Sequence, residues 1–250
     1  MLKVNIENIT LSNGSDINIL LRDIRFETNF GNVYTILGTN GAGKSTLIKS
    51  LTRLLNENIF SIKGKVLFQG KNLFRCSEDR LRSFREFSIR YVFQDAVSSF
   101  DPLKTFKYYF DKPGADKNYI IELLEYFLMP QYHEIINLHP YEISGGMTQR
   151  LSIILALLAD PELLILDEPT SAIDYTILNL LLIKLKEFTK EEKKTVLLVT
   201  QDIRFAEKVS DEIAFLSNGT LSAFKLKYEF FKQTDGEVLQ SLLNSFSEIK

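Results

Sequence analysis

The chain has 250 residues, a length that suits one large domain or one core with a smaller inserted lobe. Apolar residues make up 45% and charged residues 25%, which is ordinary for a folded domain, and a formal net charge of −2 gives no strong positive field for nucleic acid. Cys76 is the only cysteine, so neither an internal disulfide nor a multi-cysteine metal cluster can form. The N-terminus lacks the long apolar core of a signal peptide, and the most apolar stretches are far shorter than the ~20 residues that span a bilayer. Any membrane role is therefore expected to come through partner subunits.

The first third of the chain alternates like strands and contains one glycine-rich loop. The expected elements are strands over 4–11, 17–30 and 33–37, a helix over 44–55, an edge strand over 65–69, a helix over 77–86 and a strand over 90–93. The arginines near the last two elements are expected on a solvated helix face; they are Arg80, Arg82, Arg85 and Arg90.

An aromatic-rich segment without strand alternation runs from Gln94 to about His139, and we interpret it as an inserted helical lobe. One helix face is predicted from apolar residues at helical spacing, and Pro130 ends that helix. The apolar residues are Ile120, Leu123, Leu124, Phe127 and Leu128. Five other aromatic residues either fill the core of this lobe or line a groove for a short helix of a membrane partner. They are Phe100, Phe106, Tyr108, Tyr109 and Phe110.

The rest of the chain alternates between apolar helices and buried strands. Ser144 opens a helix that Asp160-Pro161 stops, and the continuous apolar run Leu163 to Leu166 is typical of the middle of a parallel sheet. The further expected elements are a helix over 175–190, strands over 195–200 and 213–216, a hairpin turn at Asn218-Gly219 and a closing helix marked by Leu239, Leu242, Leu243 and Phe246.

The segment from Gly38 to Thr46 matches the pattern G-x-x-x-x-G-K-[ST], between a predicted strand and a predicted helix. Glycines let backbone N–H groups curl round a polyphosphate, and the start of the helix adds positive potential. Lys44 can reach the outer phosphates, and the Ser45 hydroxyl can ligate Mg²⁺. The expected phosphate-binding residues are Gly38, Asn40, Gly41, Ala42, Gly43, Lys44, Ser45 and Thr46.

Two adjacent carboxylates, Asp167 and Glu168, follow the buried run Leu163 to Leu166. Neighbouring carboxylates at a sheet edge repel each other and resist desolvation, and a divalent cation with a positioned water relieves both problems. Asp167 is therefore expected on the metal side, and Glu168 is expected to polarise an attacking water.

Three motifs, in this order and spacing, resemble those of the ABC ATPases, and the resemblance covers nearly the whole chain. Leu166 to Asp174, LDEPTSAID, is similar to that family's second nucleotide motif and the loop after it. Ile143 to Arg150, ISGGMTQR, is similar to its signature sequence. Gln94 stands where the family keeps a glutamine that senses metal and water and hinges the helical lobe.

The resemblance implies an α/β fold: a P-loop NTPase core with a mostly parallel sheet, an N-terminal antiparallel β subdomain and an inserted α-helical subdomain. Residues 1–93 and 160–250 would form the core with the β subdomain, and residues 94–159 would form the helical subdomain. The implied cofactors are ATP and Mg²⁺. The implied catalytic residues are Glu168, Gln94 and Gln201, and the implied metal ligands are Ser45, Gln94 and Asp167.

The signature also has a physical logic of its own. The Ser144 hydroxyl and the unobstructed amides of Gly145 and Gly146 form a second anion-binding helix start. Since the chain already has one phosphate loop, this helix start is free for the nucleotide of another molecule. In the resembling family two subunits face each other with two ATP molecules between them, and Asp174 would lie at their seam.

Two positions depart from the family pattern. Gln201 follows the predicted strand where the family usually has a histidine, and glutamine can hydrogen-bond the γ-phosphate but cannot hold a proton. We therefore hypothesise that the ATP held by this chain's own loop turns over slowly. The family usually stacks an aromatic ring on the base near the end of the first strand, whereas residues 10–16 contain none and Leu11 offers only an apolar contact.

Met147, in the fifth place of the signature, and the run from Phe93 to Pro102 resemble the matching motifs in the ATPase subunits of peptide and nickel importers. Importers of this branch pair two different ATPase subunits. The short chain is more similar to the nickel-type member, because many peptide-type members carry a C-terminal cysteine cluster that is missing here. The resemblance implies as partners a second, different ATPase subunit, integral membrane permease subunits and, indirectly, an extracytoplasmic solute-binding protein, and it implies no nucleic acid. The implied location is the cytoplasmic face of the cell membrane.

Two alternatives to an ATP-hydrolysing import subunit stay open from the sequence. A largely structural subunit would bind ATP to complete its partner's catalytic site and hydrolyse little, which fits Gln201. A soluble ABC ATPase outside transport would carry a long coiled coil or two cassettes. About a hundred residues without sustained heptads separate Lys44 from Ser144, and the chain holds one cassette, so this alternative fits less well.

Overall fold

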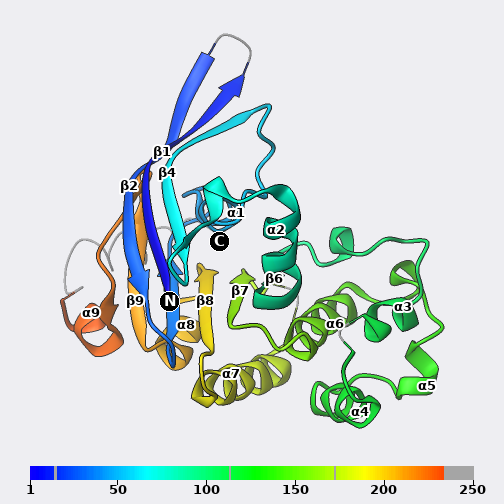
Figure 1. Ribbon diagram of the computed structural model, residues 1–250. Helices are drawn as coiled ribbons and strands as arrows, with labels where there is room; N and C mark the ends of the chain where they lie inside the picture. The colour runs from blue at the N-terminus through cyan, green and yellow to red at the C-terminus, as the bar shows by residue number, and fades with distance from the viewer. Residues whose placement is uncertain (14–15, 113, 172, 234–250) are drawn as a thin grey trace.

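Two sheets with helices between and around them make up the computed structural model, which describes residues 1–13, 16–112, 114–171 and 173–233 (Figure 1). The first sheet is antiparallel and has the order β2-β1-β4-β5. Its strands are β1 (Leu2–Asn13), β2 (Asp16–Thr28), β4 (Phe60–Phe68) and β5 (Lys71–Asn72).

The second sheet is mostly parallel and has the order β10-β9-β3-β8-β7-β6, with β11 also paired to β9. Its strands are β3 (Val33–Leu37), β6 (Ile89–Val92), β7 (Leu163–Asp167), β8 (Thr195–Thr200), β9 (Glu212–Ser217), β10 (Thr220–Leu221) and β11 (Lys225–Leu226). Every residue of β3, β7 and β8 is buried, which explains why these strands are continuous apolar runs instead of alternating ones. The carboxyl ends of these three parallel strands therefore meet at one edge, where polar side chains of a site have a rigid support.

The helices differ in length and cover both faces of the parallel sheet. They are α1 (Lys44–Ser50), α2 (Glu78–Ser83), α3 (Phe106–Asp111), α4 (Lys117–Tyr126), α5 (Tyr132–Ile135), α6 (Gly145–Leu158), α7 (Tyr175–Lys190), α8 (Ile203–Val209) and α9 (Lys227–Gln233). The described residues also form three short 3-10 helices and one π-helix: η1 (Leu73–Arg75), η3 (Val97–Ser99) and η4 (Pro140–Glu142) are 3-10 helices, and η2 (Phe84–Ser88) is the π-helix.

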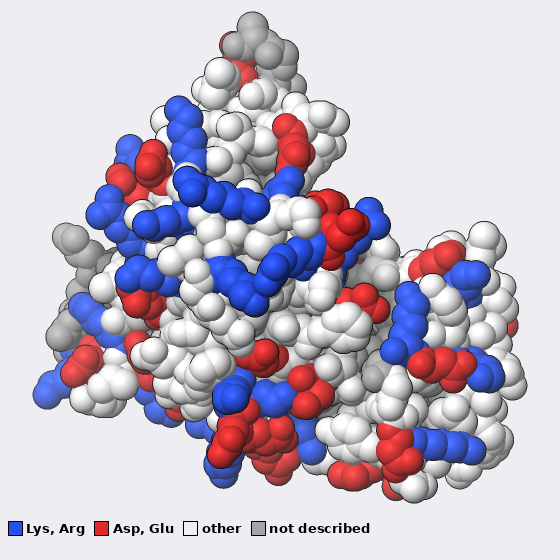
Figure 2. All heavy atoms as spheres, viewed as in Figure 1, with Lys and Arg blue, Asp and Glu red and all other residues white. Residues whose placement is uncertain are grey.

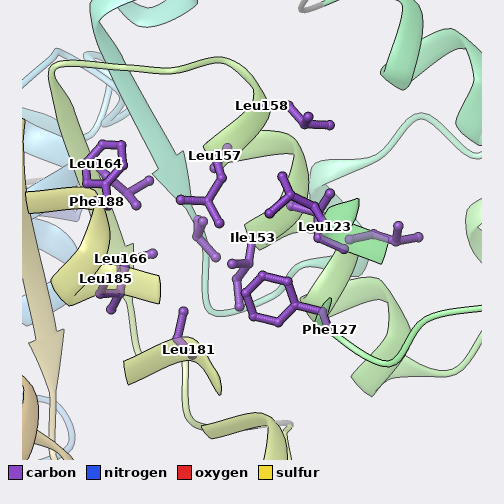
Figure 3. Packing of buried hydrophobic residues seen from close by; sticks show 14 of the residues in the cluster. Leu123, Phe127, Ile153, Leu157, Leu158, Leu164, Leu166, Leu181, Leu185 and Phe188 are labelled. Carbon is purple, nitrogen blue, oxygen red and sulfur yellow. The ribbon is translucent and has the colours of Figure 1, made fainter. Parts of the chain in front are cut away.

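Alternate residues of the parallel strands face two separate apolar cores. One core lies between the two sheets and includes Leu47 and Ile48 of α1 together with Ile36 of β3. The other core lies on the opposite face, where Leu164 and Leu166 of β7 meet α4, α6 and α7 (Figure 3). The phosphate-loop helix is therefore enclosed between two sheets, which fixes its position relative to β7.

Four of the five aromatic residues singled out above in the helical segment pack into its apolar core. Phe106 and Phe110 of α3 are almost fully buried, and Phe100 packs against the rings of Phe106 and Tyr109. Tyr108 alone of the five is an exposed ring, with Lys112 above it. The structure therefore favours the core interpretation of these residues, while the boundaries of the helical subdomain at 94 and 159 stay a prediction.

Several expected elements differ in the structure. The first helix ends at Ser50 instead of Leu55, and Arg53 then takes a left-handed φ of 56°, which breaks the helix. The strand expected at the edge over 65–69 begins at Phe60, lies between β1 and β5, and is thus not the last strand of its sheet. The closing helix expected from Leu239 to Phe246 lies outside the described residues.

The expected solvated arginine face is wrong for two of its four members. Arg80 and Arg82 are exposed on α2. Arg85 is partly buried and donates to the Thr52 carbonyl at 2.9 Å, and Arg90 lies in strand β6 with its Nε atom buried. The partial burial of Arg90 depends on the elements that cover β6, so its neighbours in sequence do not reveal it.

The surface carries charges of both signs. Figure 2 shows a band of Lys and Arg over the antiparallel sheet and α2, with acidic groups interspersed on the rest of the same face. Within the described residues, no helix is both long and apolar enough to cross a membrane.

Candidate functional site

The glycine-rich loop joins β3 to α1, and its two ends cannot carry a side chain. Gly43 has a φ of 96°, and a Cβ atom there would lie 2.8 Å from Cδ2 of Leu21 on β2. A Cβ atom on Gly38 would lie 2.8 Å from the backbone oxygen of Leu216 on β9. Both sheets thus press on the loop, and only glycine leaves its backbone amides free to curl round a ligand.

Lys44, the first residue of α1, is buried at the centre of this loop. Its Nζ atom donates to the carbonyl oxygens of Gly38 and Thr39 at 2.8 and 2.9 Å. It also forms an ion pair with Oε1 of Glu168 at 3.0 Å, and both side chains of this pair are at most 7% exposed. The loop lysine and the predicted catalytic carboxylate therefore lie within direct reach of each other.

Glu168 directly follows β7 and has a left-handed backbone, with a φ of 46°. Its amide donates to the Val199 carbonyl at 2.9 Å, and its Oε2 atom accepts from the backbone N–H of Gln201 at 3.1 Å. A non-glycine residue in this conformation is strained, and such strain persists where surrounding contacts determine it. The neighbouring strand β8 and the residue after it thus aim the carboxylate at the loop lysine.

The predicted role of Gln201 depends on its side chain, whereas the contact seen here is made by its backbone amide. Any residue except proline could make this contact, so it carries no information about the histidine that the family usually has at this position. The effect of the Gln201 side chain on turnover stays a prediction.

Asp167 is the last residue of β7 and is held by α1. The Ser45 hydroxyl donates to Oδ1 of Asp167 at 2.8 Å. Burial is the main cause that raises the pKa of Asp167 above its ordinary value, and the adjacent Glu168 charge adds to it. The Ser45 hydrogen bond and the positive charges of Lys49 and Lys44 act in the opposite direction. Because burial destabilises the ionised form of Asp167, a further cation nearby would stabilise that form.

A cavity of about 650 Å³ brings the three predicted metal ligands together. Ser45, Asp167 and the exposed Gln94 all line it. A hydroxyl, a carboxylate and an amide oxygen form the oxygen donor set that Mg²⁺ prefers, so these residues fit that ion. Lys49 lines the same cavity and was not singled out from the sequence, although it lies four residues after Ser45 and hence on the same helix face.

The signature residues lie elsewhere, at the start of α6. The Ser144 hydroxyl caps this helix by accepting from the Met147 amide at 3.3 Å, as predicted. Ser144 and Gly145 are exposed, and a Cβ atom on Gly145 would meet no atom within 4 Å. None of the three signature residues, Gly146 included, lines the cavity beside Asp167. Asp174, expected at a seam between subunits, is exposed and caps α7 through a 3.0 Å bond from the Ile177 amide.

Comparison with known proteins identifies the family. The model of the ABC transporter family matches residues 21–171, which contain the glycine-rich loop, the signature and both carboxylates. The chain is 34% identical over 226 residues to the dipeptide transport ATP-binding protein DppD of Caldanaerobacter subterraneus subsp. tengcongensis, covering 87% of this chain and 69% of that one. It is 33% identical over 211 residues to the oligopeptide transport ATP-binding protein OppD of Bacillus subtilis, covering 80% of this chain and 59% of that one.

The fold is also that of a solved ABC cassette. The dimeric structure of a post-hydrolysis state of the ATP-binding cassette MJ0796, bound to ADP and Pi, matches 91% of this chain and 99% of its own. The TM-score is 0.76 at 26% sequence identity. The antiparallel sheet, the mostly parallel sheet and the added helices predicted from the sequence are thus confirmed. The chain belongs to the ABC transporter family and is one of its ATPases.

Proposed function

We propose that this chain energises the import of dipeptides or oligopeptides, as an ATP-hydrolysing subunit bound to membrane permease subunits at the cytoplasmic face of the cell membrane. The observation that carries the hydrolytic part is the buried group of Lys44, Asp167 and Glu168, held together by the loop, β7 and β8. The names of the relatives DppD and OppD support the transport part.

Within the site each residue has a proposed role. The amides from Gly38 to Thr46 cradle the phosphates of ATP, and Lys44 binds the outer phosphates. A triphosphate offers Lys44 more negative charge than the single carboxylate of Glu168 does, so Lys44 exchanges its partner on binding. Glu168 is then free to accept a proton from the attacking water, while the Gln201 amide keeps one of its oxygens in place.

Ser45, Gln94 and Asp167 are proposed to hold Mg²⁺, which supplies positive charge next to the phosphates. Asp167 orients the Ser45 hydroxyl through their 2.8 Å hydrogen bond, and Gln94 reaches the same cavity from the end of β6. Because Gln94 begins the segment that leads into the helical lobe, its position links the metal end of the cavity to the lobe.

The second half of the nucleotide-binding site is proposed to come from another subunit. Ser144 and Gly145 lie exposed at the start of α6, with Gly146 partly exposed beside them, and all three are apart from the cavity of their own chain, so they are available to the nucleotide of a facing subunit. The dimeric state of the solved MJ0796 cassette supports such a pairing. We propose a second, different ATPase subunit as the facing partner, and an extracytoplasmic solute-binding protein that delivers the cargo.

The cargo is proposed to be peptide, with nickel or a metal chelate as the competing outcome. The similar proteins named above transport dipeptides or oligopeptides by name, while the shortness of the chain suggested a nickel-type subunit. A second candidate function, a largely structural subunit that hydrolyses little ATP, is favoured by Gln201 in the place of the family's histidine.

The test uses the transporter assembled from this chain, its second ATPase subunit and its membrane subunits in lipid vesicles. We expect ATP-dependent uptake of a labelled dipeptide or tetrapeptide and none of ⁶³Ni²⁺. Glu168→Gln should lower hydrolysis by about 100-fold or more while fluorescent ATP still binds. Glu192→Gln, on an exposed residue, is the matched control and should leave both unchanged.

Uptake of nickel instead of peptide would replace the proposed cargo and keep the ATPase. Hydrolysis that survives Glu168→Gln but stops after the equivalent change in the second ATPase subunit would support the structural alternative.

A further inference from the structure

Two large apolar residues are exposed at the outer end of the antiparallel sheet, which comprises residues 10–12 of β1 and 16–19 of β2. Ile17 and Ile19 of β2 have relative exposures of 68% and 64%. β2 is the last strand of its sheet, and Figure 1 shows its beginning, paired with the end of β1, projecting beyond the helices. β4 begins at Phe60, opposite Leu11, so of the described strands only β1 and β2 continue past that point.

The strand pairing shows which face of the sheet these isoleucines occupy. Residues directly opposite each other in an antiparallel pair share a face, and so do residues two apart in one strand. Thr10 of β1 lies opposite Ile19 on one side and Ser61 of β4 on the other. The residues before and after Ser61 pack against the core between the two sheets. Ile17 and Ile19 therefore lie on the outer face of the sheet, away from that core.

Three exposed cations lie on the same outer face, behind the isoleucines. Lys63 and Lys65 follow Ser61 at steps of two along β4 and are exposed. Arg22 of β2 joins them, because Asn8 of β1 lies opposite both Arg22 and Lys63. Figure 2 shows Lys and Arg gathered over this sheet, while its projecting end is largely uncharged. The outer face thus has an apolar end followed by a cationic belt.

The three cations of this belt, Arg22, Lys63 and Lys65, form no ion pair with another described residue. The ion pairs of the sheet use other charges: Lys3 with Glu27 and Arg25 with Asp23. Asp16 directly precedes Ile17 and so lies on the opposite face. The belt is therefore free to bind an anionic partner.

We propose that the outer end of β1 and β2 inserts into the surface of a bilayer that contains anionic lipid. An amphipathic segment in the membrane interface buries its apolar face by about 5–10 Å. Three residues of strand, about 10 Å, separate Ile19 from Arg22. When the isoleucines reach the boundary of the acyl chains, Arg22 and Lys63 are therefore level with the lipid phosphates, and Lys65 lies within the ~10 Å over which surface charges interact.

The combination of side chains favours lipid over other polyanions. Residues 10–25 contain no aromatic ring, so this end of the sheet offers no stacking platform for the bases of a single-stranded nucleic acid. A nucleic acid would also leave the two isoleucines exposed to water, whereas a bilayer takes up the isoleucines and the cations together.

The inference goes beyond the function proposed above, because this chain alone should bind lipid without its membrane subunits. Two isoleucines and three cations make a weak, reversible anchor, since stable attachment to a bilayer takes a second signal. Contact with the membrane subunits supplies that signal in the assembled transporter, and each attachment then strengthens the other.

A single tryptophan tests the insertion directly. The chain contains none, so Ile17→Trp in the full chain places one reporter at the proposed point of insertion. With vesicles of equal parts phosphatidylcholine and phosphatidylglycerol, its emission should shift to shorter wavelength and be quenched by brominated acyl chains. With phosphatidylcholine alone, the same shift should need at least about tenfold more lipid. Phe87→Trp is the matched control, because Phe87 is 66% exposed on η2, outside this sheet, and its emission should not shift.

Cosedimentation with the phosphatidylglycerol vesicles tests the residues without a reporter. Arg22→Gln with Lys63→Gln should weaken binding about 25-fold, at about fivefold for each cation. Ile17→Ser with Ile19→Ser should weaken it by about tenfold or more. Lys190→Gln with Arg204→Gln removes the same charge from exposed positions on α7 and α8 and should leave binding unchanged. Thermal unfolding of each variant checks its fold.

No emission shift of Ile17→Trp with the anionic vesicles, or equal weakening by the Arg22/Lys63 and Lys190/Arg204 pairs, overturns the proposal. A shift that needs the second ATPase subunit and does not occur with vesicles assigns the isoleucines to a protein contact and overturns it too. In each of these cases, peptide uptake by the wild-type transporter leaves the proposed function in place.

Discussion

Asp167 and Glu168 are adjacent buried carboxylates that the structure treats in different ways. Glu168 is paired with Lys44 and accepts a backbone hydrogen bond, whereas Asp167 has only the Ser45 hydroxyl at hydrogen-bonding distance among the described side chains. Asp167, which is proposed to bind metal, is thus the one of the two carboxylates whose negative charge the protein compensates less. That difference leads to a prediction about pH.

The free energy of unfolding should depend on the charge of Asp167. Since its folded-state pKa is raised, mainly by burial, the protonated form is favoured in the fold, and this contribution to stability is present below the ordinary pKa and lost as pH rises through the raised one. Asp167→Asn removes the charge, so in the absence of Mg²⁺ it should raise the free energy of unfolding at pH 7 and lose this advantage at pH 3. Urea denaturation at both pH values measures it, and a variant less stable at pH 7 than the wild type contradicts it.

The side chain of Gln201 should limit the turnover of ATP. Gln201→His keeps the backbone N–H that bonds Glu168 and adds a group that can hold a proton near the γ-phosphate. We expect steady-state hydrolysis by the assembled transporter to rise, by at most roughly 10²-fold, which is the lower end of what a positioned acid or base contributes. An unchanged or lower rate argues against this account of Gln201.

Sequence predicted those site residues that belong to a local motif. The loop from Gly38 to Thr46 and the pair Asp167-Glu168 could be recognised because their spacing along the chain reflects one phosphate cradle and one strand end. Lys49 could not be recognised in this way, because its place at the site depends on which cavity it lines after distant elements pack together. The backbone contact of Gln201 was equally invisible, because every residue type except proline can make it.

At the scale of elements, the loop between β3 and α1 depends on its contacts with both sheets. Gly43 has the left-handed φ of the helix N-cap and abuts Leu21 of β2. The match to the phosphate-loop pattern predicted a glycine there for access to phosphate. The structure adds a packing reason, which a pattern read along the chain could not supply because β2 and the loop are brought together only by the fold.

Gly43→Ala should therefore impair both stability and nucleotide binding. A left-handed backbone costs an alanine about 1–2 kcal/mol, and the contact of the new Cβ atom with Leu21 adds about 1–3 kcal/mol of overpacking. Gly31→Ala is the matched control, since Gly31 has a φ of 87° and a Cβ atom there would meet no atom within 4 Å. This control should show only the backbone cost and bind ATP normally. Equal losses of stability in the two variants, measured by urea denaturation, contradict the packing argument.

Element types were easier to predict than element ends. The strands β3, β7 and β8 were found within one residue because a fully buried parallel strand is an uninterrupted apolar run. The end of α1 was missed by five residues, because the apolar residues after Ser50 continue the helical spacing while Arg53 turns the backbone to a left-handed conformation. Such a local reversal is decided by tertiary packing and leaves little trace in composition.

At the scale of the whole molecule, two parts of the proposed nucleotide site lie apart in the chain. These half-sites are the phosphate loop and the signature at the start of α6. The helix that follows the phosphate loop is enclosed between the two sheets, while the start of α6 lies exposed on the helical segment (Figure 1). The family and the α/β fold could be predicted from three motifs in order. The partner that joins the half-sites could not, because the residues that select it act only in an assembly of several chains.

The most direct test of the account is a cross-link from the signature to the facing subunit. Cys76→Ser removes the only native cysteine, and Gly145→Cys, in open space, carries a photoreactive maleimide in a transporter trapped by Glu168→Gln with ATP and Mg²⁺. We predict that mass spectrometry finds the label on the glycine-rich phosphate loop of the facing ATPase subunit, and only when ATP is present. A label confined to the chain that carries Gly145→Cys or to the membrane subunits, or a label that forms equally without ATP, would contradict the proposed binding of nucleotide between two subunits.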